Sequence, residues 1–180
     1  MSALRAPIWL ITGVPGSGKT SVCGELASRY VSGVHLETDV MDEEGLHRYG
    51  EMDRPIERLL FRRGVALMAA EFAMSGVAVV IDDTLESDEE RRAYTDRLRG
   101  VRLVHLLPPL EVALTRNASR TNKPEGDAPM LDRTARRLYP RMRVEHTERR
   151  GWHVFDPSAL DPRETVDALI ERFGLEDLSD

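Results

Sequence analysis

The sequence is poor in cysteine and histidine, the residues that cross-link small secreted proteins or bind zinc. It has one cysteine, Cys23, among 180 residues, which excludes a disulfide framework within the chain and a cysteine-rich zinc site. Its five histidines are scattered, without the spacing of metal ligands. No apolar run approaches the roughly 20 residues that a membrane-spanning helix needs.

The first ten residues also lack the features of a secretory signal. They contain one arginine and only short apolar stretches before a glycine-rich turn, so we expect a cytoplasmic protein with no membrane partner. The length suits one compact domain, residues 1–180, because a chain of this size buries a sufficient core without covalent staples.

Acidic charge exceeds basic charge, but the excess is uneven. The formal net charge is −6 at pH 7, which argues against nucleic acid or an anionic membrane as a partner. Residues 1–90 carry 16 acidic and 8 basic side chains, whereas residues 116–150 carry 10 basic and 5 acidic ones. The basic stretch either meets a small anion or is a solvated helix face.

Strand and helix patterns alternate along the chain. Short apolar runs predict strands at 8–12, 34–38, 77–81, 101–106 and 154–155. Helical spacing predicts helices at 17–30, 55–76, 88–98, 111–120, 131–146 and 162–173, whereas 41–54 is expected to be irregular. Such alternation predicts an α/β fold with a central parallel sheet and helices on both faces.

Residues 13–20, Gly-Val-Pro-Gly-Ser-Gly-Lys-Thr, match the phosphate-binding P-loop pattern G-x-x-x-x-G-K-[ST]. Glycines let the loop aim successive N–H groups at phosphate oxygens, and the helix that follows adds its positive dipole end. We expect Lys19 to meet the β- and γ-phosphates and the Thr20 hydroxyl to bind Mg²⁺. Cys23 is expected to be a small packed residue. The expected nucleotide-binding residues are Gly13, Val14, Pro15, Gly16, Ser17, Gly18, Lys19, Thr20 and Ser21.

The P-loop alone does not decide between ATPases, GTPases and small kinases. A GTPase needs a base-reading Asn-Lys-x-Asp segment after a strand. The nearest match, Asn122-Lys123-Pro124-Glu125, has Glu in place of Asp and follows a predicted helix. We therefore treat it as a coincidence.

Acidic residues follow two of the predicted strands. Ligands meet the carboxyl ends of the strands in an open parallel sheet. Asp39 comes directly after strand 34–38, which we expect to lie next to the P-loop strand. Its carboxylate can accept the proton of an acceptor hydroxyl, or it can cap the next segment. Asp42, Glu43 and Glu44 are expected to be a solvated run.

Asp82, Asp83 and Thr84 follow strand 77–81. A carboxylate after such a strand typically acts on Mg²⁺, directly or through water. Asp82 is the first choice because it continues the strand, and Asp83 is the alternative. Thr84 either contacts the substrate or caps a turn.

Arginines gather around a segment of loop composition at 121–129. Arg116 and Arg120 are four residues apart and share a helix face, and an Arg-rich helix follows. Two helices and a loop with inward arginines, at about 116–137, are typical of a lid that closes over a nucleotide. Alternatively, Arg133, Arg136 and Arg137 pair with the acidic half as surface residues.

In this order, the motifs resemble the small P-loop kinase group that includes bacterial polynucleotide kinase, zeta toxin and chloramphenicol phosphotransferase. The resemblance covers about residues 8–173. It implies a P-loop NTPase sandwich of three layers, with about five parallel strands and a helical lid. It also implies that Asp39 is the general base, that Asp82 and Thr84 match an Asp-x-Thr motif, and that Arg116 and Arg120 belong to the lid.

The resemblance also implies that loop 156–158 lies near adenine. The chain departs from polynucleotide kinases at Leu85, where they tend to have Asn. It also lacks the Gly-Gly-Gly run of shikimate kinases and the Asp-Gly-Phe-Pro-Arg segment of adenylate kinases.

We therefore expect a phosphotransferase that moves the γ-phosphoryl group of Mg·ATP to a hydroxyl of a small molecule. The expected catalytic residues are Asp39, Lys19, Arg116 and Arg120, the metal ligands are Thr20 and Asp82, and Arg116 also binds the nucleotide. Segment 41–54 and the apolar face of 55–76 are expected to shape the acceptor pocket. A 5′-hydroxyl polynucleotide kinase and a nucleotide-binding regulator with little turnover remain alternatives. The acceptor and the oligomeric state stay undetermined.

Overall fold

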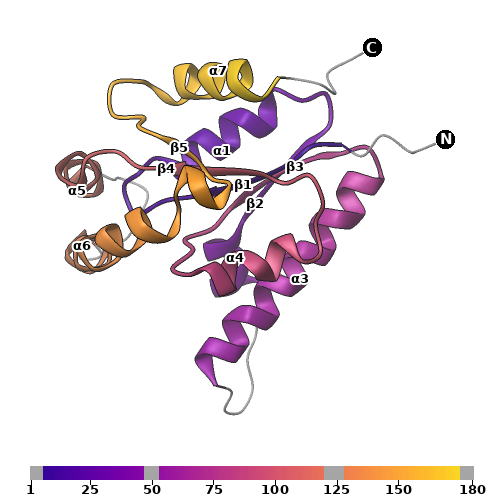
Figure 1. Cartoon of the computed structure of the whole chain (residues 1–180), viewed down its shortest axis with the longest axis horizontal. Helices are drawn as coiled ribbons and strands as arrows, with labels where there is room; N and C mark the ends of the chain where they lie inside the picture. Colours follow the sequence, from indigo (N-terminus) through magenta and orange to yellow (C-terminus); the bar gives the residue numbers. More distant parts are fainter. Residues whose placement is uncertain (1–5, 47–52, 120–127, 175–180) are drawn as a thin grey trace.

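A computed structural model of the chain describes residues 6–46, 53–119 and 128–174. Its centre is a parallel sheet of five strands, as predicted, in the order β2-β3-β1-β4-β5 (Figure 1). The strands are β1 (Ile8–Thr12), β2 (Gly33–Glu37), β3 (Ala78–Asp82), β4 (Arg102–Leu106) and β5 (His153–Phe155).

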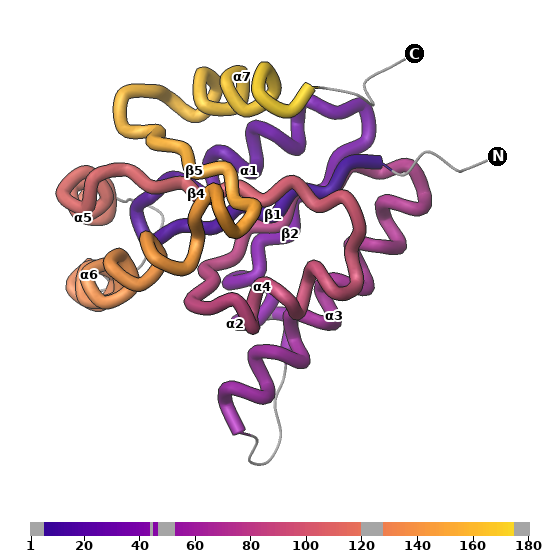
Figure 2. The backbone as a smooth tube through the Cα atoms, in the orientation of Figure 1, coloured from indigo at the N-terminus to yellow at the C-terminus, as the bar shows by residue number. Residues whose placement is uncertain are grey.

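Helices cover both faces of the sheet, which gives the predicted three layers. The helices α1 (Lys19–Ser28) and α7 (Pro162–Phe173) lie side by side on one face, and α3 (Arg54–Met74) and α4 (Asp88–Thr95) lie on the other (Figures 1 and 2). A further pair, α5 (Leu110–Ala118) and α6 (Ala128–Glu145), packs together beside the P-loop through Val14. Two short helices complete the described elements: the α-helix α2 (Thr38–Glu44) and a 3₁₀ helix at Glu148–Arg150.

Every residue of the central strand β1 is buried because helices cover both of its faces. Ile8 and Leu10 pack toward α3 and α4, whereas Trp9 and Ile11 pack toward α1 and α7. This alternation follows from the two-residue period of a strand. No helix of the described residues is long and apolar enough to cross a membrane.

Two expectations from the sequence are wrong. Residues 41–44 are helical, not irregular, because α2 begins directly after β2; its first turn holds Asp39, where a carboxylate stabilises the helix dipole. Moreover, β2 is an edge strand, and β3 separates it from the P-loop strand. The burial patterns explain this order: all of β3 is buried, whereas most of β2 is only half-buried or exposed, which suits an edge.

Two histidines are buried beneath the carboxyl half of the sheet. The ring of His146 stacks on Trp152 with 4.7 Å between ring centroids, and its carbonyl oxygen lies 3.1 Å from Nδ1 of His105. Burial lowers the pKa of His105 to about 4 and that of His146 to about 3. Both rings are therefore neutral in the folded protein at pH 7.

We expect the free energy of unfolding to fall as the pH decreases from about 6.5 to about 4. In this window the unfolded chain binds protons on these histidines and the folded chain does not, so acid favours unfolding. His146→Leu removes one of the two groups and should flatten the pH profile by about 1.4 kcal/mol per pH unit at most. Urea unfolding at several pH values measures both slopes. Identical slopes would show that His146 does not resist protonation.

Candidate functional site

The P-loop joins β1 to α1 and is held in an unusual backbone conformation. Gly16 and Gly18 have φ angles of 85° and 97°, which only glycine adopts without strain. At Gly16 a Cβ atom would also lie 2.1 Å from the carbonyl oxygen of Ala113. The α5 helix thus presses against the loop, and both glycines are required for its shape.

The side chain of Lys19 folds back into the P-loop. Its Nζ donates a hydrogen bond to the carbonyl oxygen of Gly13 at 3.0 Å, and the side chain is buried. The ammonium group therefore lies inside the loop, where it can interact with a phosphate.

Thr20 and Asp82 bring two oxygen ligands together beside Lys19. Thr20 Oγ1 donates to Asp82 Oδ2 at 2.7 Å, and Asp82 is only 4% exposed. Burial raises the pKa of the Asp82 carboxyl, but Lys19, His35 and the Thr20 hydrogen bond outweigh burial and hold that pKa below its usual value. An ionised carboxylate next to a hydroxyl is a donor set that suits Mg²⁺.

The neighbouring Asp83 faces away from the P-loop. Arg62 donates to it through Nε at 2.7 Å and Nη2 at 3.1 Å, and the Tyr94 hydroxyl donates at 2.7 Å. Arg62 also donates to Glu90 at 2.9 Å. Of the two aspartates, only Asp82 contacts the P-loop helix. Sequence reasoning missed Arg62, because a buried arginine interrupts the apolar face of α3 without any recognisable motif.

One pocket borders the P-loop at Gly16, Ser17 and Gly18. It has a volume of about 260 Å³ and is lined by residues of the loop, Arg116, and the segment from Pro157 to Thr165. Arg116 Nη2 donates to the carbonyl oxygen of Pro157 at 2.9 Å, and Nη1 lies 3.5 Å from that of Ser17. The guanidinium group thus joins α5, the P-loop and the loop after β5. Arg120 lies outside the described residues.

A second pocket, of about 400 Å³, borders the P-loop at Pro15. The structure places Asp39 here, at the start of α2. The other lining residues come from α2, α3, the segment after β3, and α6: Thr38, Asp42, Glu43, Arg58, Phe61, Arg62, Asp83, Thr84, Glu86, Met130, Leu131, Thr134 and Leu138.

This lining corrects the expected one. The α3 helix contributes mainly its charged side chains, whereas Leu60 and Leu67 of its predicted apolar face are exposed. The α6 helix supplies an apolar wall that the sequence did not indicate. Leu85 is fully buried, so it does not line the pocket.

The surface of α6 supports the simpler of the two predictions for its arginines. Arg137 pairs with Glu86 at 3.0 Å, and Arg136 lies 3.9 Å from Glu111. Arg137 therefore pairs with the acidic first half of the chain, whereas the partner of Arg136 lies on the neighbouring helix α5.

Asn117 is a second residue that sequence reasoning missed. Its buried Nδ2 donates to the carbonyl oxygen of Pro15 at 3.3 Å and to Asp132 at 3.2 Å. It therefore braces the P-loop against α6. Its only signal in the sequence is its place beside Arg116.

Comparisons with known proteins agree with this fold. The family model described as AAA domain (AAA_33) matches residues 8–141. None of the curated proteins matches the chain. A sugar kinase from Janibacter has a similar structure, with 19% identity and a TM-score of 0.68 over 97% of this chain and 99% of that one. The tunicamycin resistance protein of Deinococcus radiodurans is similar with 19% identity and a TM-score of 0.63, over 95% and 97%.

Arg62→Met should destabilise the protein by about 3–5 kcal/mol, because it leaves the buried Asp83 carboxylate without its cation. Arg63→Met is the matched control: Arg63 is the next residue on α3 and is exposed, so its loss should cost less than about 0.5 kcal/mol. Urea unfolding measures both values.

The same experiment has an internal check. Adding Asp83→Asn to Arg62→Met should restore part of the lost stability, since no unpaired charge then remains buried. Equal losses for Arg62→Met and Arg63→Met would contradict the structural role of the pair.

Proposed function

This chain belongs to the AAA_33 family of AAA domains, and we propose that it is a kinase that transfers the γ-phosphoryl group of ATP to a hydroxyl of a small molecule. The observation that carries this proposal is a pair of pockets that border the P-loop at different residues, one at Gly16, Ser17 and Gly18 and the other at Pro15. A phosphotransferase must hold donor and acceptor on the two sides of the transferring group. One of the similar structures is that of a sugar kinase, which supports the same reaction class.

We assign the nucleotide to the pocket beside Arg116. The base would lie beside the Arg116 guanidinium and against the loop after β5, which Arg116 holds in place through its hydrogen bond to Pro157. The phosphates would meet the P-loop N–H groups and Lys19. Arg116 is separated from Asp39 by the P-loop, so we assign it to nucleotide binding.

Thr20 and Asp82 would hold Mg²⁺, which neutralises phosphate charge when it is bound. The fit rests on their hydrogen bond of 2.7 Å and on the low pKa of Asp82. The carbonyl oxygen of Asp82 also accepts a hydrogen bond from Thr38 at 2.8 Å. This hydrogen bond joins Asp82, the proposed metal ligand, to Thr38, the residue before Asp39.

Asp39 would act as the general base in the second pocket. The acceptor hydroxyl oxygen forms the new bond to the γ-phosphorus, its proton passes to the Asp39 carboxylate, and the bond to the β-phosphate oxygen breaks to release ADP. Asp39 borders the same pocket as Pro15 of the P-loop, which is the arrangement that this step requires.

The charge of the second pocket favours a neutral or cationic acceptor. Five carboxylates and two guanidinium groups are among its lining residues, so an anionic acceptor would be repelled. One basic group near the rim, Arg137, pairs with Glu86. A polynucleotide needs several basic contacts along one surface, and this pocket offers the opposite charge.

The wild-type protein should form ADP and a phosphorylated product from Mg·ATP and a panel of neutral or cationic hydroxyl compounds, sugars included. Lys19→Ala should abolish the product in a protein that still folds, as circular dichroism checks, because the Lys19 ammonium group is the charge that meets the phosphates. Mass spectrometry of the mixture detects the added phosphoryl group. ATP binding without any product would favour a regulator, and salt-sensitive labelling of 5′-hydroxyl oligonucleotides would favour a polynucleotide kinase; either result would overturn the proposal.

Asp39→Asn should lower the rate of phosphoryl transfer by about 10²–10³-fold, because Asn keeps the shape but cannot take the proton. The affinity for ATP, measured by calorimetry, should stay unchanged. Glu43→Gln is the matched control, since Glu43 borders the same pocket and is exposed. Equal losses in both variants, or a parallel loss of ATP affinity in Asp39→Asn, would show that Asp39 is not the base.

A further inference from the structure

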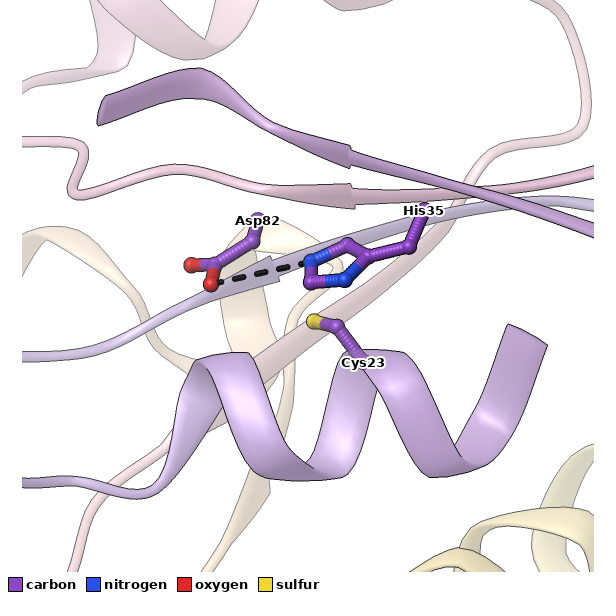
Figure 3. A group of neighbouring side chains, drawn as sticks. All are labelled: Cys23, His35 and Asp82. Atoms are coloured by element: carbon purple, nitrogen blue, oxygen red, sulfur yellow. Dashed lines mark ion pairs between the residues drawn. The ribbon is translucent and has the colours of Figure 1, made fainter. Parts of the chain in front are cut away.

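Three side chains with metal-binding atoms converge beneath the P-loop helix. Cys23 of α1, His35 of β2 and Asp82 of β3 point toward one another (Figure 3), and one ligand atom from each lies within 4.8 Å of the others. The closest measured approach is 3.9 Å, between His35 Nε2 and Asp82 Oδ2. Thiolate, imidazole and carboxylate are the three ligand types that zinc uses in proteins.

The separations are close to those of a metal site. Zinc bonds of about 2.0–2.3 Å in a tetrahedral arrangement place ligand atoms about 3.4–3.6 Å apart. The three atoms therefore need to approach one another by at most about 1.2–1.4 Å, which side-chain rotations can supply.

One of these atoms is buried and forms no hydrogen bond with a described residue, although it lies 3.9 Å from the Asp82 carboxylate. His35 Nε2 makes no hydrogen bond within the described part of the chain, although it is shielded from solvent. A buried polar atom of this kind calls for an explanation, such as an ion. Cys23 is fully buried and follows Thr20 by three residues, so both lie on the face of α1 that meets Asp82.

From this convergence we propose that Cys23, His35 and Asp82 form a site for a thiophilic divalent cation such as Zn²⁺. The donor set selects such a cation over Mg²⁺, which prefers oxygen ligands alone. The site has three protein ligands and leaves a fourth position open. The histidine is 19% exposed, which gives the cation a route from solvent.

The site shares a carboxylate with the nucleotide-binding region. The oxygen nearest to His35, Asp82 Oδ2, is the same atom that accepts the hydrogen bond from Thr20 at 2.7 Å. A cation bound to this oxygen withdraws its negative charge from the side of the P-loop. If Asp82 also serves Mg²⁺, the thiophilic cation inhibits phosphoryl transfer; this consequence rests on the proposed function, whereas binding itself rests on the geometry alone.

Cobalt is the probe for the binding test, because a cobalt–thiolate bond absorbs in the near ultraviolet. The full chain is prepared without a histidine tag, freed of metal and titrated with Co²⁺. The titration is done at about pH 8, because a bound cation must displace the thiol proton and burial raises the pKa of Cys23. We expect one equivalent of Co²⁺ to give the thiolate band and Zn²⁺ to abolish it.

The variants assign the ligands. Cys23→Ser should remove the band, and His35→Gln should weaken Co²⁺ and Zn²⁺ binding by about tenfold or more. His153→Gln, on β5 at the other edge of the sheet, should bind like wild type. Thermal unfolding checks that each variant folds, and Cys23→Ala replaces Cys23→Ser if the latter does not.

The outcomes separate this proposal from the proposed function. A wild-type protein without the thiolate band, or with a Zn²⁺ affinity unchanged by both Cys23→Ser and His35→Gln, would overturn the metal site even if phosphoryl transfer is intact. A thiolate band that depends on Cys23 and His35 supports the site even if no acceptor is phosphorylated. Where transfer is measured, about tenfold more Zn²⁺ should be needed to inhibit Cys23→Ser than wild type.

Discussion

The buried carboxylate of Asp82 is the group on which the rest of the site depends. It lies at the carboxyl end of β3, directly beside the P-loop strand, and its ionised form survives burial because Lys19, His35 and Thr20 stabilise the charge. Through its side chain it fixes the start of α1, and through its carbonyl oxygen it fixes the start of α2 at Thr38. Loss of the carboxylate would therefore disturb the P-loop helix directly, and a shift of the residue 82 backbone would also reach the helix that carries Asp39.

The two aspartates that end β3 divide the work between the two faces of the sheet. Asp82 accepts a hydrogen bond from Thr20 of α1 on one face of the sheet. Asp83 accepts hydrogen bonds from Arg62 of α3 and Tyr94 of α4 on the other face. The buried ion pair of Arg62 and Asp83 also holds the α3 wall of the second pocket in place. Arg62 and Asp83, which have no chemical role in the proposed reaction, thus help to determine the shape of the pocket that would receive the acceptor.

The α5 and α6 helices give the P-loop its other support. Gly16 leaves no space between the loop and Ala113, Asn117 braces Pro15, and Val14 packs among the buried residues of both helices. This region was expected to be a lid, and its described part packs against the loop. The same packing places the apolar wall of α6 at the second pocket. A movement of α5 or α6 would therefore displace the backbone of the P-loop.

The sequence by itself determined the local features of the protein. The P-loop, the five parallel strands, the helices between them and the position of Asp82 after a buried strand follow from short motifs and from the periods of strands and helices, which neighbouring residues decide. Only the tertiary structure decided that β2 lies at the edge, that Asp83 pairs with Arg62, that α6 lines the second pocket, and that Cys23 and His35 meet Asp82. These features depend on strand order and on which helix faces which strand. Such contacts join residues far apart in the chain, so no local pattern records them.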